Sequence, residues 1–364
     1  MKKFSKKYKK KEVIFFCPSI EEGGVEKNLI NIANGLTKEF KIFVITANKN
    51  KKKLFSKNIN FISPKSNYYN NKSRILKSLI CSYFLFRYCK SNFLVFSFQS
   101  NLIAILTSKL LNAKVIVRSN SSPNYYASSF FKRKLIKFIF NFADKIVVNS
   151  IEFKKEFKKF FSITPTVIYN LIEPKKLILK KYNKQTSFKF FDKSNDYLKI
   201  LSVGRLVDQK DHITILKAIN LIKKKRKLKL CIIGKGILYG RLKKFIDENN
   251  LRNHVKLIGY KKNVYPYFKK SDLFILSSLY EGLPNSLIEA LTLGLKIISS
   301  NCKTGPKEIL NKGKYGKLFK VGDYKTLSNI ILNSKKRNSN KFVIDNRFDF
   351  KNNLEKYKNI ITQV

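Results

Sequence analysis

Two glutamates eight positions apart mark the segment of this chain whose residues are best suited to bind a polar ligand. Pro284 stands between them and suits the first position of a helix, because a helix leaves that N–H unpaired in any case. Glu281 is therefore predicted to lie in the loop before the helix, and Glu289 more than one turn inside it. The amides of the first turn form an anion site; they belong to Asn285, Ser286 and Leu287. The segment is predicted to hold a phosphorylated sugar by its hydroxyls and phosphates, and the alternative is an ordinary junction with two solvated carboxylates.

Two cations follow the first strand of the second half of the chain. Gly204 comes directly after a strand-like run at 198–203 and permits a tight turn, and Arg205 and Lys210 lie in the loop beyond it. A guanidinium fork and an ammonium point charge together suit a diphosphate. Any two cations are weak evidence in a chain with 76 lysines and arginines, but the position at a strand end favours a ligand-binding role.

Three further turns at strand ends are candidate binding sites. Gly234 opens a Gly-Lys-Gly turn that departs from GxGxxG and lacks an acidic residue about 20 positions later, which favours a nucleotide-sugar contact or a plain turn over an NAD site. Gly23 and Gly24 precede the first helix, where glycine permits either close approach of a ligand or a simple turn. Arg118 and Asn120 end a strand, and they either contact substrate across a cleft or belong to a solvated loop.

The composition limits the class of protein. A chain of 364 residues is predicted to form two domains. The net charge of +53 is compatible with nucleic acid, an anionic membrane or an anionic substrate as partner. Abundant Lys, Asn, Ile and Phe are typical of AT-rich codons, which explain most of that charge. Lysine is spread along the chain, which disfavours a nucleic-acid-binding protein, yet so basic a surface adheres to anionic lipids.

The number and spacing of the cysteines and histidines exclude several kinds of catalytic and metal-binding site. The five cysteines form no CxxC pair, which indicates a reducing cytosol rather than disulfides or a zinc site. His212 and His254 are the only histidines and are both expected at the surface. Triad, Cys-His and metal-histidine chemistries therefore lack residues, which excludes many classes of hydrolase and metalloenzyme.

Strand-like and helix-like runs alternate along the chain, which predicts an α/β fold with parallel sheets. Expected strands are 13–17, 41–47, 93–98, 114–118, 145–148, 166–169, 198–203, 228–233, 255–258, 273–276, 296–299 and 315–319. We predict an N-terminal domain over 1–170, a linker over 171–197, a C-terminal domain over 198–341, and a helix over 342–364 that crosses back to the N-terminal domain. Two doubly wound domains bind ligands at the carboxyl ends of their strands.

An amphipathic helix is predicted over 128–142. Its aromatic and aliphatic side chains, with lysines and an arginine between them, suit either a membrane interface or the core, and we expect the core. The run at 151–161 has the same ambiguity. The basic N-terminus lacks the apolar core of a signal peptide, and no apolar run of about 18 residues indicates a transmembrane helix.

Taken in order, these motifs resemble the family-four retaining glycosyltransferases of the GT-B fold. The matching segments are GGVEKNLINIANGL, FSFQSN, SVGRLVDQKDH, IIGKG, EGLPNSLIEA and SNCKTGPKEIL. The resemblance implies two Rossmann-like domains that face a cleft, a nucleotide-sugar donor on the C-terminal domain and an acceptor on the N-terminal domain.

The resemblance also implies roles for single residues. Arg205 and Lys210 would neutralise the donor diphosphate, Glu281 would bind hydroxyls of the transferred sugar, and Glu289 would bind the ribose. The backbone at 285–287, with the turns at Gly204 and Gly234, would complete the donor site. The acceptor would lie near Gly23, Gly24, Arg118 and Asn120. Transfer would retain anomeric configuration, and neither a metal ion nor a cofactor would be needed.

One departure concerns the strand that ends in Arg118. Many members of the family carry a histidine there, whereas Arg118 and Asn120 are similar to members that act on acetylated amino sugars in surface-glycan assembly. We therefore expect a cytoplasmic enzyme, peripheral on the inner face of the membrane, that moves a hexose or N-acetylhexosamine from a UDP-sugar to a polyprenyl-diphosphate-linked saccharide. The alternatives are a non-catalytic glycan-binding relative and a nucleic-acid-binding protein.

Overall fold

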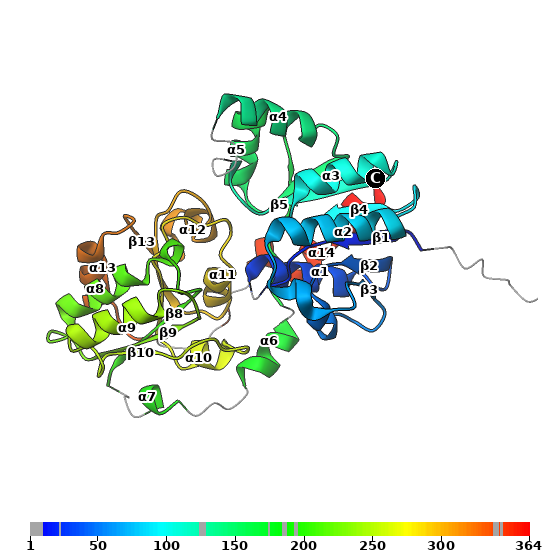
Figure 1. The fold of residues 1–364 in the computed structure, drawn as a ribbon. Helices are drawn as coiled ribbons and strands as arrows, with labels where there is room; N and C mark the ends of the chain where they lie inside the picture. The colour runs from blue at the N-terminus through cyan, green and yellow to red at the C-terminus, as the bar shows by residue number, and fades with distance from the viewer. Residues whose placement is uncertain are drawn as a thin grey trace, which may run out of the picture. The chain divides into compact units, whose positions relative to one another are not determined.

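The chain folds into two compact units, each built on a parallel sheet (Figure 1). The computed structural model describes residues 10–21, 23–123, 129–173, 175–183, 188–192, 196–337, 342 and 345–364. Unit 1 comprises Met1–Leu171 and Phe350–Val364, and unit 2 comprises Ile172–Asp349. The start of the predicted helix at Ser128 lies outside the described residues.

Unit 1 contains a seven-stranded parallel sheet in the order β3-β2-β1-β4-β5-β6-β7. The strands are β1 (Glu12–Phe16), β2 (Lys41–Ile45), β3 (Asn60–Ile62), β4 (Leu94–Ser97), β5 (Lys114–Ser119), β6 (Lys145–Val148) and β7 (Thr166–Val167). Successive side chains of a strand point to opposite faces, and here both faces are apolar. Val13 and Phe15 enter one hydrophobic core while Ile14 and Phe16 enter another. The uninterrupted apolar runs in the sequence arise because helices cover both faces.

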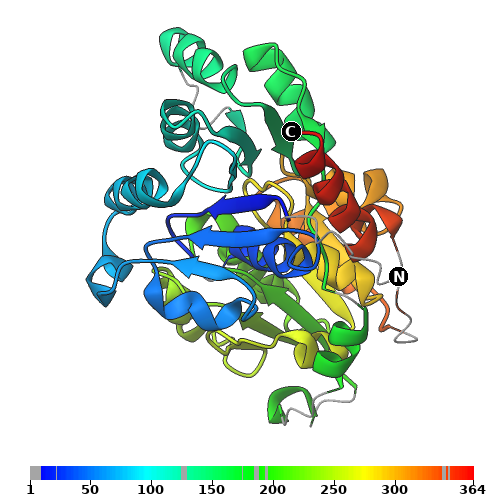
Figure 2. The same ribbon diagram turned by 90° about the vertical axis from the view of Figure 1, so that its right-hand side faces the viewer.

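Helices cover the two faces of this sheet in separate groups. One core is closed by α1 (Gly24–Gly35) and α14 (Phe350–Thr362). The other is closed by α2 (Arg74–Tyr88), α3 (Asn101–Leu110), α4 (Phe130–Phe140) and α5 (Ile151–Phe161). Figure 2 shows α14, in red, as a helix that joins unit 1 from the far end of the chain.

Unit 2 contains a six-stranded parallel sheet in the order β10-β9-β8-β11-β12-β13. The strands are β8 (Leu198–Val203), β9 (Leu228–Ile233), β10 (Val255–Leu257), β11 (Leu273–Leu276), β12 (Lys296–Ser300) and β13 (Lys317–Phe319). One face packs against α8 (His212–Ile222), α9 (Tyr239–Glu248) and α13 (Tyr324–Leu332). The remaining helices are α6 (Lys175–Tyr182), α7 (Lys189–Asp192), α10 (Tyr265–Lys269), α11 (Asn285–Thr292) and α12 (Pro306–Ile309).

Both sheets are Rossmann-like, and each reverses its strand order at one point. In unit 1 the reversal lies between β1 and β4, and in unit 2 between β8 and β11. The loops that leave two such strands run to opposite sides, so ligands bind at their carboxyl ends. The predicted α/β fold with parallel sheets is confirmed. Among the described residues, no helix is both long and apolar enough to cross a bilayer.

Several local predictions differ from the structure. The short edge strand β3 is absent from the prediction because its three residues show too little alternation. The segment predicted as a linker contains α6 and α7, and α6 contacts α10 of unit 2. Pro284 is the residue before helix α11 rather than its first residue.

A buried guanidinium ties the C-terminal helix to the sheet of unit 1. Arg118, at the end of β5, is 0% exposed. Its Nε donates to the Tyr357 hydroxyl of α14 at 2.8 Å, and its Nη2 donates to Asn170 Oδ1 at 2.6 Å. Its Nη1 donates to Asn120, and its guanidinium lies over the Phe98 ring at 5.6 Å. Of the segment predicted as a helix over 342–364, Phe350–Thr362 forms α14 in unit 1, held there by this contact and by its apolar face.

Replacing Arg118 should loosen α14. We expect Arg118→Ala to lower the free energy of unfolding by about 3–5 kcal/mol, because buried acceptors lose their donor. Tyr357→Phe should cost about 1–3 kcal/mol, since it leaves one buried N–H unpaired. Urea unfolding, with hydrogen exchange of the α14 amides, measures both. The exposed Tyr239→Phe is the matched control, and an equal effect of all three changes would contradict the anchoring role.

Candidate functional site

The loops that follow β8 and β11 meet at the strand-order reversal of unit 2. The Leu279 amide donates to the Gln209 carbonyl at 2.9 Å, and the Gln209 side-chain amide donates to the Tyr280 carbonyl at 3.0 Å. The Ser277 hydroxyl donates to the carbonyl of Asp211 at 2.8 Å. The two loops therefore form one surface, and they carry Arg205, Lys210 and Glu281.

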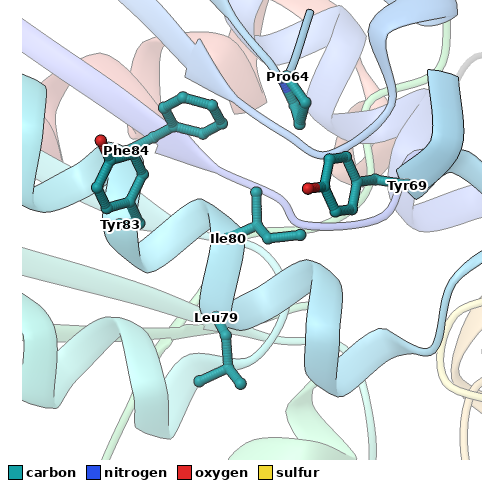
Figure 3. Close-up of a pocket in the computed structure, with 6 residues that line it drawn as sticks. All are labelled: Pro64, Tyr69, Leu79, Ile80, Tyr83 and Phe84. Atoms are coloured by element: carbon teal, nitrogen blue, oxygen red, sulfur yellow. The ribbon is translucent and has the colours of Figure 1, made fainter. Parts of the chain in front are cut away.

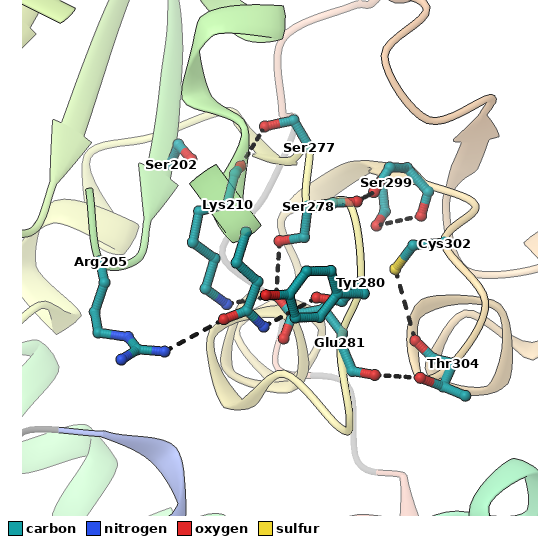
Figure 4. A network of polar contacts seen from close by, with 12 residues as sticks. Ser202, Arg205, Lys210, Ser277, Ser278, Tyr280, Glu281, Ser299, Cys302 and Thr304 are labelled. Atoms are coloured by element: carbon teal, nitrogen blue, oxygen red, sulfur yellow. Dashed lines mark hydrogen bonds and ion pairs between the residues drawn. The ribbon is translucent and has the colours of Figure 1, made fainter. Parts of the chain in front are cut away.

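An ion pair between Lys210 and Glu281 lies at the centre of this surface (Figure 4). The Lys210 ammonium contacts Glu281 Oε1, and the Ser278 hydroxyl donates to the same oxygen at 2.6 Å. The Thr304 hydroxyl donates to the Glu281 carbonyl. The two charged side chains are 14% and 6% exposed, so they are shielded from bulk water but not sealed from it. Two predicted site residues from segments 71 positions apart are thus in direct contact.

Arg205 lies beside this pair as the exposed cation of the site. Its Nη2 donates to Gln209 Oε1 at 3.3 Å, and its side chain is exposed. Figure 4 shows its guanidinium on the same side of the loop as the Lys210 ammonium. An exposed guanidinium remains able to form a bidentate contact with a phosphate.

Two glycines in this region are required by backbone packing. A side chain at Gly234 would meet the Gly204 carbonyl at 1.8 Å, so the turn after β9 lies against the turn after β8. Gly305 has φ +89°, and a side chain there would meet the Gly282 carbonyl at 2.2 Å. Packing between turns accounts for the glycine at 234, which was predicted as a nucleotide-sugar contact or a plain turn.

Helix α11 carries the second predicted glutamate. Glu289 is buried on the fifth residue of α11, and the Tyr265 hydroxyl lies 3.4 Å from its Oε1. Glu281 lies in the preceding loop, as expected. Asn285 and Ser286 are half-buried, whereas Leu287 is buried and its amide donates to the Pro284 carbonyl at 3.1 Å. The predicted anion site therefore lacks the Leu287 amide.

In unit 1 the predicted residues occupy different positions. Gly23 caps α1 and Gly24 is its first residue, and a side chain at Gly23 would meet Glu26 Oε2 at 2.5 Å. Asn120 is half-buried, and its side-chain amide donates to the Phe98 carbonyl at 3.0 Å. Arg118 is fully buried, so it does not lie in a solvated loop, and its contact with the substrate stays a prediction.

A buried polar contact at the strand-order reversal of unit 1 was absent from the prediction. The Gln99 side-chain amide donates to Glu26 Oε1 at 2.9 Å, and Gln99 Oε1 accepts from the Ser19 amide at 3.0 Å. Glu26 and Ser19 are buried. The signals in the sequence were the position of these residues after the first and fourth strands and the presence of Glu26 and Gln99 in two of the matching family segments.

His212 and the cysteines are not surface groups, whereas His254 is half-buried. His212 was predicted to be exposed, but it begins α8 beneath the Gly204 turn and is buried, with Nδ1 3.4 Å from the Ser202 hydroxyl. Burial and the positive charge of Lys210 lower the pKa of His212 to about 4. All five cysteines are buried and free. Burial and the neighbouring Glu281 carboxylate raise the pKa of Cys302 to about 12.

An open pocket of about 430 Å³ lies elsewhere in unit 1, between α2 and the segment that carries Pro64 and Tyr69 (Figure 3). Its lining is apolar and aromatic, from Pro64, Tyr69, Leu79, Ile80, Tyr83 and Phe84. It contains none of the predicted site residues.

Comparison with known proteins identifies the chain. Residues 22–176 match the model of Glycosyltransferase Family 4, and residues 183–359 match that of Glycosyl transferases group 1. Together the two models span most of the sequence. The chain belongs to the family-four glycosyltransferases. The predicted family resemblance is thereby confirmed.

Relatives of this glycosyltransferase differ in how much of the chain they share. This chain is 35% identical to an uncharacterized glycosyltransferase of Methanocaldococcus jannaschii. The matched region covers 55% of this chain and 51% of the relative. The chain is 28% identical to N-acetylgalactosamine-N,N'-diacetylbacillosaminyl-diphospho-undecaprenol 4-alpha-N-acetylgalactosaminyltransferase of Campylobacter jejuni, over 84% of its length and 85% of the relative. The match thus spans about half of the first relative and most of the second.

The glycosyltransferase fold is also similar to a solved structure. The structure of HepE of Anabaena in complex with UDP and glucose superimposes on this chain with a TM-score of 0.76 at 16% sequence identity. The superposition covers 97% of this chain and 100% of the HepE chain. This similarity confirms the predicted GT-B fold.

The buried His212 should make the stability of the glycosyltransferase depend on pH. The unfolded chain takes up a proton at the ordinary histidine pKa, whereas the folded chain resists protonation down to about pH 4. We therefore expect the free energy of unfolding to fall by about 2 kcal/mol as the pH falls from about 7.5 to about 5. Urea unfolding at each pH measures this fall.

His212→Asn is the comparison variant. It should be less stable at neutral pH and should lose less stability on acidification, because His254 alone remains. An unchanged pH dependence would show that His212 titrates normally.

Proposed function

We propose that this protein is a retaining, metal-independent glycosyltransferase. It moves a hexose or an N-acetylhexosamine from a nucleotide sugar, a UDP-sugar in the favoured case, to a lipid-linked glycan. The product is a saccharide on polyprenyl diphosphate for surface polysaccharide, and the enzyme works in the cytoplasm at the inner face of the membrane. The observation that carries the proposal is the contact of Lys210 with Glu281 beside the exposed Arg205.

The cations of this site suit the charge that develops during transfer. As the bond from sugar to diphosphate breaks, negative charge grows on the leaving phosphates. Fixed cations stabilise that charge more than they stabilise the bound donor, which lowers the barrier. Arg205 is exposed and meets the diphosphate first. Lys210, already held by Glu281, needs little reorganisation to face it.

Glu281 has two roles in this proposal. Its Oε1 accepts from Lys210 and Ser278, which fixes the direction of the carboxylate. The carboxylate then accepts hydrogen bonds from hydroxyls of the transferred sugar. Glu289, on α11, binds the ribose hydroxyls of the nucleotide, and the half-buried Asn285 and Ser286 lie near the phosphates.

The named relatives support the choice of donor and acceptor. The Campylobacter relative, similar over 84% of this chain, is named for transfer to a diphospho-undecaprenol saccharide. HepE was solved with UDP and glucose. The acceptor side of the proposal is the strand-order reversal of unit 1, with Gly23, Gly24 and Asn120 nearby and Glu26 with Gln99 buried at its base.

The donor site is tested by single substitutions. Arg205→Ala and Glu281→Gln should each reduce transfer from the accepted nucleotide sugar by about a hundredfold or more, because each removes a contact to the transition state. A panel of nucleotide sugars in a thermal-shift assay identifies the donor, since a ligand of the folded state raises its stability. Radiolabel transfer to a polyprenyl-diphosphate saccharide then gives the rate.

Arg252→Ala and Glu248→Gln are the matched controls, because both side chains are exposed at the end of α9. They should leave the rate unchanged. Full activity in the Arg205 or Glu281 variant would refute the roles given above, and binding of a nucleotide sugar without any transfer would favour a non-catalytic relative.

Chelation tests whether a metal ion takes part. With Arg205 and Lys210 facing the diphosphate, we expect the rate to change less than about twofold after dialysis against EDTA. A large loss that Mg²⁺ or Mn²⁺ restores would contradict metal independence. Re-addition of each ion to the control variants separates a catalytic effect from a general one.

A further inference from the structure

The outer side of the α2, α3 and α4 group carries an unusual number of exposed apolar side chains. These three neighbouring helices cover the same face of the unit 1 sheet and contact one another in sequence. More than half of the exposed large hydrophobic side chains of the described residues lie on them. We call this set the α2–α4 surface; its apolar members are Ile75, Leu76, Leu79, Tyr83, Phe86, Tyr88, Leu106, Leu110, Phe130, Phe131, Leu135 and Phe138.

The exposed residues follow helical spacing, so they form stripes. On α2 the stripe includes Ile75, Leu79 and Tyr83, and on α4 it includes Phe131, Leu135 and Phe138. The opposite side of α4 buries only Ile136, Ile139 and Phe140. The prediction that the aromatic face of this helix packs in the core is therefore wrong for most of its members. Phe131 is 82% exposed, although phenylalanine side chains are usually buried in folded proteins.

The charge of the α2–α4 surface is of one sign. The three helices contain no aspartate or glutamate. Their exposed or half-buried cations are Arg74, Arg87, Lys109, Lys132, Arg133, Lys134 and Lys137. The Asp144 carboxylate, beyond the end of α4, pairs with Lys109 and Lys114. Codon bias accounts for many lysines, but it does not remove acidic residues from three consecutive helices.

We propose that the α2–α4 surface binds an anionic lipid bilayer, with its apolar stripes in the headgroup region and its cations against the lipid phosphates. The inference rests on the proposed function, because a lipid-linked acceptor is met at a membrane. Apolar side chains gain free energy as they leave water, and each lysine or arginine near the surface adds attraction to anionic lipid. The membrane–water interface is a favourable place for aromatic rings, which lie at the level of the lipid headgroups. The surface offers Tyr83, Tyr88 and four phenylalanines for this position.

Other occupants fit the surface less well. A second copy of the chain would bring two sets of cations together without carboxylates between them, and like charges repel. Single-stranded nucleic acid stacks its bases on aromatic rings, but the exposed leucines on all three helices offer no stacking face. A bilayer uses both the aliphatic and the aromatic side chains.

Vesicle flotation of the full-length protein tests the proposal. The probes are vesicles of phosphatidylcholine alone and vesicles with roughly one-third phosphatidylglycerol, each at about 0.1 M and about 0.5 M salt. We expect the protein to bind the anionic vesicles. The triple variant Phe131→Ser, Leu135→Ser, Phe138→Ser should bind them about tenfold more weakly or worse. These side chains are exposed, so the variant should fold, and its circular dichroism and thermal midpoint check this.

Matched controls separate the surface from general basicity. Lys132→Glu with Lys134→Glu should weaken binding, whereas Lys224→Glu with Lys225→Glu, on an exposed turn of unit 2, should not. Leu221→Ser, at a 48% exposed position of α8, should also bind as the parent does. Equal loss in both lysine pairs, or a triple variant that binds normally, would overturn the proposal. So would a triple variant altered only in self-association or in RNA binding.

Separate measurements test the proposed function and the proposed membrane surface, so the failure of one can be told from the failure of the other. Thermal shift by the nucleotide sugar, measured without vesicles, reports the donor site alone. A variant that keeps this shift and no longer floats with vesicles supports the α2–α4 surface. Parent protein that floats but shows no shift and no transfer contradicts the proposed function while leaving the membrane surface intact.

Discussion

The candidate site depends on one contact, the ion pair between Lys210 and Glu281. Each of these charges is largely withdrawn from water, and each would be costly to leave unpaired. Their pairing requires the loop after β8 and the loop after β11 to lie side by side, which the strand order of unit 2 provides. The hydrogen bonds through Gln209, Ser277 and Ser278 then fix the two loops. The site is therefore organised before any ligand enters it.

The glycines near the ion pair allow the surrounding loops to pack closely. Gly234 lets the turn after β9 lie against the Gly204 carbonyl, and Gly305 lets a third turn reach the Gly282 carbonyl. With side chains at these positions the turns would separate, and the ion pair would lose the walls that shield it from solvent. The glycines of this region are thus explained by the packing of loops, and the ligand-binding groups are the side chains that those loops carry.

Much of the fold could be predicted because parallel strands buried on both faces leave continuous apolar runs in the sequence. The predicted bounds of β8, β9 and β11 are the observed ones. Glu281, Arg205 and Lys210 could be located because they follow such strands. Sequence reasoning failed where burial depends on distant segments. His212 and Arg118 look like surface residues by type, but the Gly204 turn and α14 cover them, whereas Phe131 and Phe138 of α4 are exposed. Gln99 and Ser278 gain their importance from contacts that no local pattern reveals.

The position of Arg118 also determines when each unit can be completed during synthesis. Arg118 and Asn170 are made before unit 2, whereas Tyr357 and the rest of α14 are made after it. Unit 2 is contiguous, so all of its residues leave the ribosome before unit 1 has its final helix. Until then the core formed by α1 and the sheet lacks one wall, and the Arg118 Nε–H has no partner from α14. Most of unit 1 is made before unit 2, yet unit 1 can finish folding only after all of unit 2 has been made.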